Sequence, residues 1–129
     1  MSGAKEQALA VLAKWSKAFS DSDVDGIVSL YAPDAIFLGT GSKNVTTSPQ
    51  DIRQYFEKGL LNNRPRGARL VSYEATVLSE DAVLVAGLDA VSGVRDGEPY
   101  TNTGRATFVV AKRGPDWKIV HFHRSAMPK

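Results

Sequence analysis

The side chains best suited to acid–base chemistry lie in one short segment, residues 117–125, which reads WKIVHFHRS. It contains both histidines of the chain, His121 and His123, followed by Arg124. An imidazole in a half-apolar pocket titrates near neutral pH, so His123 is a candidate acid or base, with His121 and Tyr55 as polar helpers. An aspartate elsewhere in the chain could orient the ring, and Asp34 and Asp89 are the candidates.

Two other interpretations of the histidines stay open. Two histidines two residues apart on a strand can share a metal ion, but such a site needs a third ligand. The chain has no other histidine and no cysteine, so we expect no metal and no cofactor. Alternatively, both histidines are hydrogen-bonded wall residues that fix the register of the strand. Arg124 either binds a carboxylate or phosphate ligand or pairs with an acidic residue across an interface.

The faces of this segment follow from strand geometry, because successive side chains of a strand point to opposite faces. One face would carry Trp117, Ile119, His121, His123 and Ser125, and the other would carry Lys118, Val120, Phe122 and Arg124. The first set begins with two large apolar residues, so we expect it to face the core. The histidines would then lie along a pocket wall, and Val120 and Phe122 would pack in a dimer interface.

Length and composition define the kind of protein that carries this segment. The chain has 129 residues, 43% of them hydrophobic and 23% charged, which is typical of one globular domain, and we assign 1–129 to it. The net charge is +2 and no basic run occurs, so nucleic-acid binding is not expected. No segment is apolar and long enough for a membrane span, so we expect a cytoplasmic protein without membrane contact.

The elements that must position the segment can be inferred from periodicity. Apolar residues at helical spacing predict helices over 4–20 and 24–31, and Ser48 followed by Pro49 predicts the start of a third helix. Residues 32–34 read as a turn and 35–38 as a short strand. Four longer strands are expected over 68–79, 82–92, 99–112 and 116–126, separated by turn residues.

Helices first and strands last predict an α+β fold with an antiparallel meander. The strands over 82–92 and 116–126 are apolar on both faces. A sheet with only one covered face would show polar residues on the other. We therefore expect the outer face of the sheet to form a homodimer, with a larger ring as a further possibility.

Two stretches carry a resemblance to known families. DSDVDGIVSLYAPDA, residues 21–35, resembles the SnoaL-like and ketosteroid isomerase-like branch of the nuclear transport factor 2-like superfamily. TNTGRATFVVAKRGPDWKIVHFHRS, residues 101–125, resembles the end of the association domain of calcium/calmodulin-dependent protein kinase II. The resemblance implies a cone-shaped, curved antiparallel or mixed sheet with three helices on its concave face, a cystatin-like roll around a pocket.

The resemblance also argues against particular activities. Ketosteroid isomerases use a tyrosine on their first helix and an aspartate after their first strand, and the matching positions here hold Trp15 and Gly39. We therefore do not expect ketosteroid isomerase activity. Two arginine positions of the kinase association domain fall on Leu88 and Phe108. This pocket is thus expected to be more apolar, and the chain has no kinase motif.

These inferences combine into one expected function and one alternative. The chain is expected to be a small homodimeric pocket protein of the SnoaL-like type that binds an apolar or aromatic small molecule. Whether it is also an isomerase-, lyase- or hydrolase-like enzyme stays open. The alternative is a non-catalytic association module without kinase activity. The residues expected to line the pocket are Trp15, Phe19, Tyr31, Phe37, Tyr55, Phe56, Leu88, Phe108 and Arg124.

Overall fold

The computed structural model describes residues 3–128, so residues 1, 2 and 129 of the predicted domain lie outside it. The helices of this part of the chain are α1 (Ala4–Ser20), α2 (Val24–Val28) and α3 (Pro49–Leu60). Its strands are β1 (Tyr31–Leu38), β2 (Gly67–Ser79), β3 (Ala82–Arg95), β4 (Glu98–Arg113) and β5 (Asp116–Ala126). The four long strands lie within three residues of their predicted bounds.

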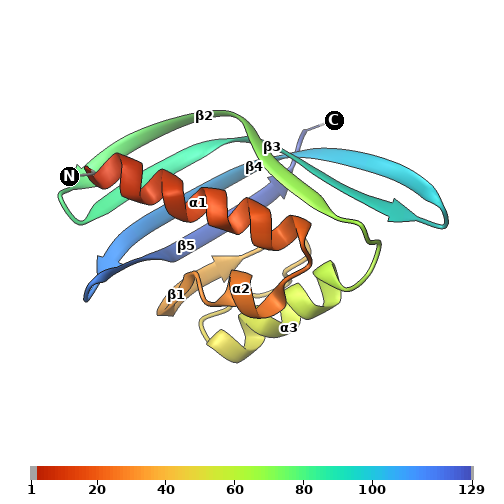
Figure 1. Cartoon of the computed structure of the whole chain (residues 1–129), viewed down its shortest axis with the longest axis horizontal. Coiled ribbons are helices and arrows are strands. Elements are labelled where there is room, and N and C mark those ends of the chain that lie inside the picture. Colours follow the sequence, from red (N-terminus) through yellow and green to blue (C-terminus); the bar gives the residue numbers. More distant parts are fainter. Residues whose placement is uncertain (1–2, 129) are drawn as a thin grey trace.

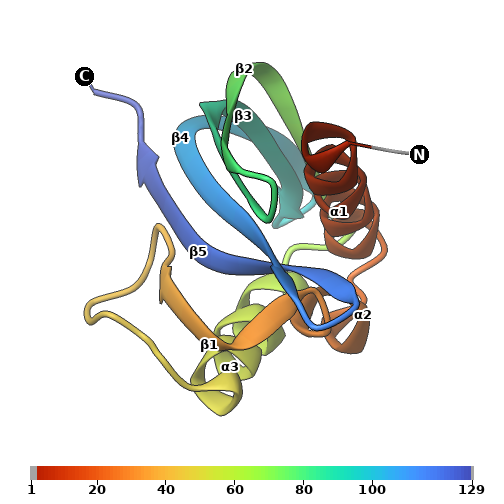
Figure 2. The ribbon, with the colours of Figure 1, turned by 90° about the vertical axis from the view of Figure 1, so that its left-hand side faces the viewer.

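The strands form one mixed sheet in the order β1-β5-β4-β3-β2. Strand β1 is parallel to β5, and all other neighbours are antiparallel. The sheet is strongly curved, and α1 and α3 lie on its concave side (Figures 1 and 2). The predicted α+β fold, a curved sheet with helices on the concave face, is confirmed. No helix within residues 3–128 has the length and apolar character needed to cross a membrane.

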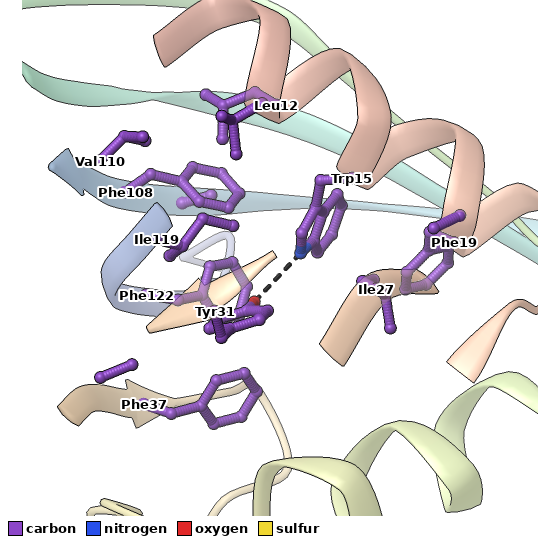
Figure 3. Close-up of a cluster of buried hydrophobic side chains, with 14 of the residues drawn as sticks. Leu12, Trp15, Phe19, Ile27, Tyr31, Phe37, Phe108, Val110, Ile119 and Phe122 are labelled. Carbon is purple, nitrogen blue, oxygen red and sulfur yellow. Dashed lines mark hydrogen bonds between the residues drawn. The ribbon is translucent and has the colours of Figure 1, made fainter. Parts of the chain in front are cut away.

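Aromatic side chains from every layer meet in the core between helices and sheet. Phe37, Phe108 and Phe122 lie side by side on β1, β4 and β5, with ring centroids 5.2 Å (Phe37–Phe122) and 4.9 Å (Phe108–Phe122) apart. Trp15 on α1 contacts Phe108 and Phe122 with its ring (Figure 3). Such pairs stabilise the fold beyond the area that they bury, by about 0.5–1.5 kcal/mol each.

The start of α3 has the predicted cap. The hydroxyl of Ser48 accepts a hydrogen bond from the amide of Asp51 at 3.1 Å, and a proline occupies the first turn. Ile52, Phe56 and Leu60 are buried at helical spacing, so α3 packs on the core through one face. Tyr55, predicted in the same stripe, is only half-buried.

The segment between α2 and β1 differs from the prediction. Helix α2 ends at Val28, and β1 already begins at Tyr31 and includes the residues 32–34 that were expected to form a turn. The amide of Ile119 on β5 donates to the carbonyl of Leu30 at 2.8 Å. This pairing with β5 makes the segment part of the sheet. Pro33 is tolerated because β1 is an edge strand, and the pairing register shifts between Tyr31 and Ile36.

Candidate ligand pocket

A β-bulge in β5 decides which side chains face the cavity. Val110 of β4 pairs with Ile119, but the preceding Val109 pairs with His121, so Val120 is an extra residue. Ile119 and Phe122 are three residues apart, yet both face the core, with exposed fractions of 0% and 3%. The alternation of faces is therefore reversed after Val120.

The predicted assignment of faces is wrong for the residues after this bulge. His121 and His123 lie on the outer face of the sheet, and His123 is exposed. The Nδ1 atom of His121 lies 3.1 Å from the carbonyl oxygen of Ile36 on β1. A catalytic role for the histidines stays a prediction, but they have no place in the concave pocket. Phe122, expected in a dimer interface, packs in the core instead.

A cavity of about 340 Å³ lies between α1, α3 and the concave face of the sheet. Five of the nine predicted pocket residues line it, namely Trp15, Phe19, Tyr55, Phe56 and Arg124. Its other lining residues are Thr40, Gly41, Lys58, Gly59, Leu60, Arg66, Val91, Tyr100, Asn102 and Phe122.

Four predicted pocket residues lie elsewhere. Tyr31, Phe37 and Phe108 are buried core residues that do not line this cavity. Leu88 is 40% exposed, because it alternates with the buried Asp89 on β3 and therefore points to the outer face. Its assignment to the pocket is wrong.

Arg124 forms the polar end of the cavity together with Asp89. Its Nε donates to both carboxylate oxygens of Asp89, at 3.1 and 2.8 Å, and its Nη2 donates to Oδ1 at 2.7 Å. Nη1 donates to the hydroxyl of Thr40 at 2.9 Å. Asp89 is buried and Arg124 is largely so, with side-chain exposed fractions of 8% and 12%. The acid that pairs with Arg124 thus belongs to the same chain and not to an interface partner.

The position of Arg124 depends on a glycine on the neighbouring strand. Gly104 of β4 is buried, and a Cβ atom at this position would overlap the guanidinium of Arg124. A side chain here would displace the guanidinium from Asp89 and Thr40. The Arg124–Asp89 pair therefore requires glycine at residue 104.

A second arginine lies in the cavity wall without an acidic partner. The Nε of Arg66 donates to the carbonyl of Ser92 at 3.0 Å, and its Nη1 donates to the carbonyl of Gly59. Its guanidinium lies over the ring of Phe19, 5.1 Å from the centroid. Within residues 3–128, no carboxylate lies within ion-pair distance of Arg66.

The indole N–H of Trp15 forms a hydrogen bond inside the core. Its Nε1 donates to the hydroxyl of Tyr31 at 3.0 Å, as the dashed line in Figure 3 shows. Burial raises the pKa of the Tyr31 hydroxyl well above its ordinary value, so this phenol stays neutral at all ordinary pH values. The N–H of Trp15 is therefore not available to a ligand, although its ring lines the cavity.

Gly39 meets the ring of Tyr55. A Cβ atom at residue 39 would overlap the Tyr55 ring and its hydroxyl oxygen. The amide of Gly41 donates to that oxygen at 3.4 Å. The space that a side chain at position 39 would need is thus taken by an aromatic ring, which leaves no room there for a general base.

The sequence contained a signal for Asp89 but none for Arg66. A lone acid inside the apolar strand AVLVAGLDAV indicates a buried partner, which proves to be Arg124. Arg66 follows α3 in an irregular segment whose path no periodicity defines. Tyr100 and Asn102, near the beginning of β4, also line the cavity. No group of three or more metal-ligating side chains is present within residues 3–128.

The architecture and its cavity define the class of protein. A curved sheet that wraps helices around a pocket is the nuclear transport factor 2-like, cystatin-like fold. One structure with this fold, a protein of Novosphingobium aromaticivorans, is 12% identical and superposes with a TM-score of 0.79 over 95% of this chain and 81% of that chain.

The family follows from the sequence of almost the whole chain. Residues 4–128 match the model of the calcium/calmodulin dependent protein kinase II association domain, and the chain belongs to this family. A Xanthomonas campestris protein assigned to the same association domain is 29% identical, with a TM-score of 0.90 over 99% of this chain and 91% of that chain. A comparison with curated proteins gives no match.

Members of the fold have been assigned other activities. A Streptomyces avermitilis protein assigned as a dehydratase of the nuclear transport factor 2-like family is 17% identical, with a TM-score of 0.85 over 97% of each chain. At this identity the similarity establishes the fold alone.

Proposed function

We propose that this chain is a cytoplasmic, homodimeric small-molecule-binding protein of the SnoaL-like type, whose ligand is an apolar or aromatic ring compound. The observation that carries the proposal is the cavity of about 340 Å³ with an aromatic wall and a polar end. Ligand pockets are usually of this kind, mostly apolar with a few polar groups that fix orientation. The proposal requires no metal or cofactor.

The aromatic wall favours a flat ligand. Trp15, Phe19, Tyr55, Phe56 and Phe122 contribute rings to the lining. Such rings pack against a ligand ring either stacked or edge-on. These contacts stabilise the complex by more than the buried apolar area alone would. The second N–H of the Arg124 Nη1 atom, which no group in the described part of the chain accepts, would orient a ligand oxygen at the end of the cavity, with Thr40 beside it.

An isomerase- or dehydratase-like reaction is a secondary part of the proposal. The histidines lie on the other face of the sheet, so proton transfer in the cavity would have to use other groups. Tyr55 and Tyr100 line the cavity, and Asp89 contacts it through Arg124. Among the described residues, the lining contains no histidine and no carboxylate, so the proposal makes binding the primary function.

The outer face of the sheet is the proposed dimer interface. Ile36, His121, Val109 and Leu84 are paired across β1, β5, β4 and β3 and form a continuous row on that face. Ile36 is 48% exposed, and the nearby Leu88 is 40% exposed. A largely apolar row across four strands is typical of a surface that a second copy covers.

The cavity is tested by changing its size at Val91, which lines it from β3. Val91→Phe would fill part of the cavity. Val91→Ala is the matched control, because it also removes the valine side chain but enlarges the cavity. We expect naphthalene carboxamide to bind the wild type and Val91→Ala, measured by ligand-observed NMR, and not Val91→Phe. Equal binding to all three proteins would contradict a ligand site in this cavity.

The interface is tested separately by sedimentation. Leu88→Glu places a charge on the outer face, and Val45→Glu is the control because Val45 is 60% exposed in a loop. We expect Leu88→Glu to sediment as a monomer and both the wild type and Val45→Glu as dimers. A monomeric wild type would rule the interface out.

The alternative is an association module that assembles without a ligand, and membership of the association-domain family favours it. Native mass spectrometry distinguishes the two functions. A dimer that carries extra mass, lost on denaturation, supports the pocket protein. A ring or dimer without bound mass, unaffected by Val91→Phe, supports the module.

A further inference from the structure

The cavity wall contains a fixed positive charge. Arg66 lies between the end of α3 and β3, and the carbonyls of Gly59 and Ser92 hold its guanidinium from two sides. The ring of Phe19 covers one face of the same group. A guanidinium has five N–H donors, and these two carbonyls use two of them. The orientation of Arg66 is therefore set by the protein, while donors remain for another acceptor.

The charges around the cavity do not balance. Its ionisable lining groups at neutral pH are the basic residues Lys58, Arg66 and Arg124. Within residues 3–128, Asp89 is the one acid in an ion pair with any of these three. Arg124 takes up that charge with its Nε and Nη2 atoms. An excess of positive charge thus remains on the side of the cavity where Arg66 and Lys58 lie.

We propose that the ligand carries one carboxylate on its apolar ring body, and that Arg66 is the residue that binds this carboxylate. The inference rests on the proposed function, because it assigns a chemical class to the ligand of the same cavity. A planar fork with free N–H groups matches the two oxygens of a carboxylate. The partly buried site strengthens such a pair relative to water.

Arg124 is a poorer receptor for the same anion. Its Nε and Nη2 atoms face Asp89, and its Nη1 faces Thr40. A carboxylate brought to Arg124 would also approach the carboxylate of Asp89 and be repelled by it. Arg124 and Thr40 form a neutral polar end that suits a hydroxyl or carbonyl oxygen, whereas Arg66 provides the charge.

The test compares two probes of nearly the same shape, naphthalene carboxylate and naphthalene carboxamide. We expect the wild type to bind the carboxylate roughly tenfold or more tightly than the carboxamide, because hydrogen bonds between charged groups are stronger than neutral ones. In Arg66→Gln the ratio of the two affinities should fall to about one, and binding of the carboxamide to this variant shows that the cavity is still accessible. Arg64→Gln is the control, since Arg64 is exposed, does not line the cavity and lies two residues away.

The outcomes separate this inference from the proposed function. If both probes bind equally well, or if Arg66→Gln keeps the preference, Arg66 is not the carboxylate receptor, although the cavity still binds rings. If the preference is lost in Arg124→Gln and retained in Arg66→Gln, the anion site lies at Arg124 and the inference is wrong. If neither probe binds and Val91→Phe changes nothing, both proposals fail. Loss of the preference in Arg66→Gln alone supports the inference.

Discussion

The guanidinium of Arg124 and the carboxylate of Asp89 form a forked ion pair between β5 and β3, with β4 between the two strands. No side chain of β4 comes between the two groups, because the residue of β4 at this place is Gly104. The pair joins strands that do not hydrogen-bond to each other and closes one end of the cavity. It therefore serves both the stability of the sheet and the shape of the site.

Removing either partner should be costly. Asp89→Ala or Arg124→Ala should each lower the free energy of unfolding by about 3 kcal/mol, because each leaves a buried charge unpaired. The double variant should lose about 2 kcal/mol less than the sum of the two single losses. Urea unfolding of the four proteins measures this coupling.

The exposed pair Arg53–Asp25 is the matched control, since its N···O distance is also 2.7 Å but its side chains are 42% and 87% exposed. Its coupling should stay below about 0.5 kcal/mol. Equal coupling in both pairs would show that burial does not strengthen the Arg124–Asp89 bridge.

Replacement by alanine should change the stability in opposite directions at Gly59, which lines the cavity, and at Gly39, which contacts the lining residue Tyr55. Gly39→Ala should destabilise the protein by about 1–3 kcal/mol, because the new methyl group meets the Tyr55 ring. Gly59→Ala should stabilise α3 by about 0.5–1 kcal/mol, since nothing lies within 4 Å of the added atom. Thermal unfolding measures both. A tolerated Gly39→Ala would show that Tyr55 moves freely.

The buried phenol of Tyr31 predicts a loss of stability at alkaline pH. Burial raises its pKa in the folded state, whereas the unfolded phenol ionises near pH 10. The unfolded state therefore releases the proton first, and the free energy of unfolding should fall as pH rises above about 10. Urea unfolding of the wild type and Tyr31→Phe across this range checks the effect. The variant should lose less stability than the wild type over the same interval.

An exposed carboxyl gives a prediction at acidic pH. The hydrogen bond from Arg113 lowers the pKa of Asp34, with an Nη2–Oδ2 distance of 3.2 Å. A lowered folded-state pKa contributes stability above the unfolded pKa, and this contribution is lost as pH falls through the folded pKa. In Arg113→Gln, an NMR titration should show the pKa of Asp34 shifted upward toward its ordinary value. High salt should produce part of the same shift in the wild type.

Local chemistry in the sequence was sufficient to predict most of the elements. Ser48, Pro49 and Asp51 marked the beginning of α3, because a cap, a proline and an acid each suit a helix N-terminus. The turn residues between strands marked the hairpins. The order of elements and the residues 101–125 indicated the family, and the family model matches residues 4–128.

The face of each residue in β5 was decided only by the tertiary structure. Strict alternation put His121 and His123 on the concave face and Phe122 and Arg124 on the outer face, although Arg124 was also predicted among the pocket residues. One extra residue, Val120, reverses that order, and a bulge depends on how β5 pairs with β4. No local pattern encodes this pairing, so a single shift in register changed the composition of the candidate site.

Contacts between segments far apart in the chain could not be predicted from the sequence either. Rings of Trp15 on α1, Phe56 on α3 and Phe122 on β5 line one cavity, although these residues are far apart in the sequence. Arg66 reaches the cavity only because the chain after α3 passes beside β3, where Ser92 and Gly59 hold it. The sequence determined most of the residues that form helices and strands, since those preferences are local. The tertiary structure alone determined which charges meet in the cavity, since those contacts join residues far apart in the chain.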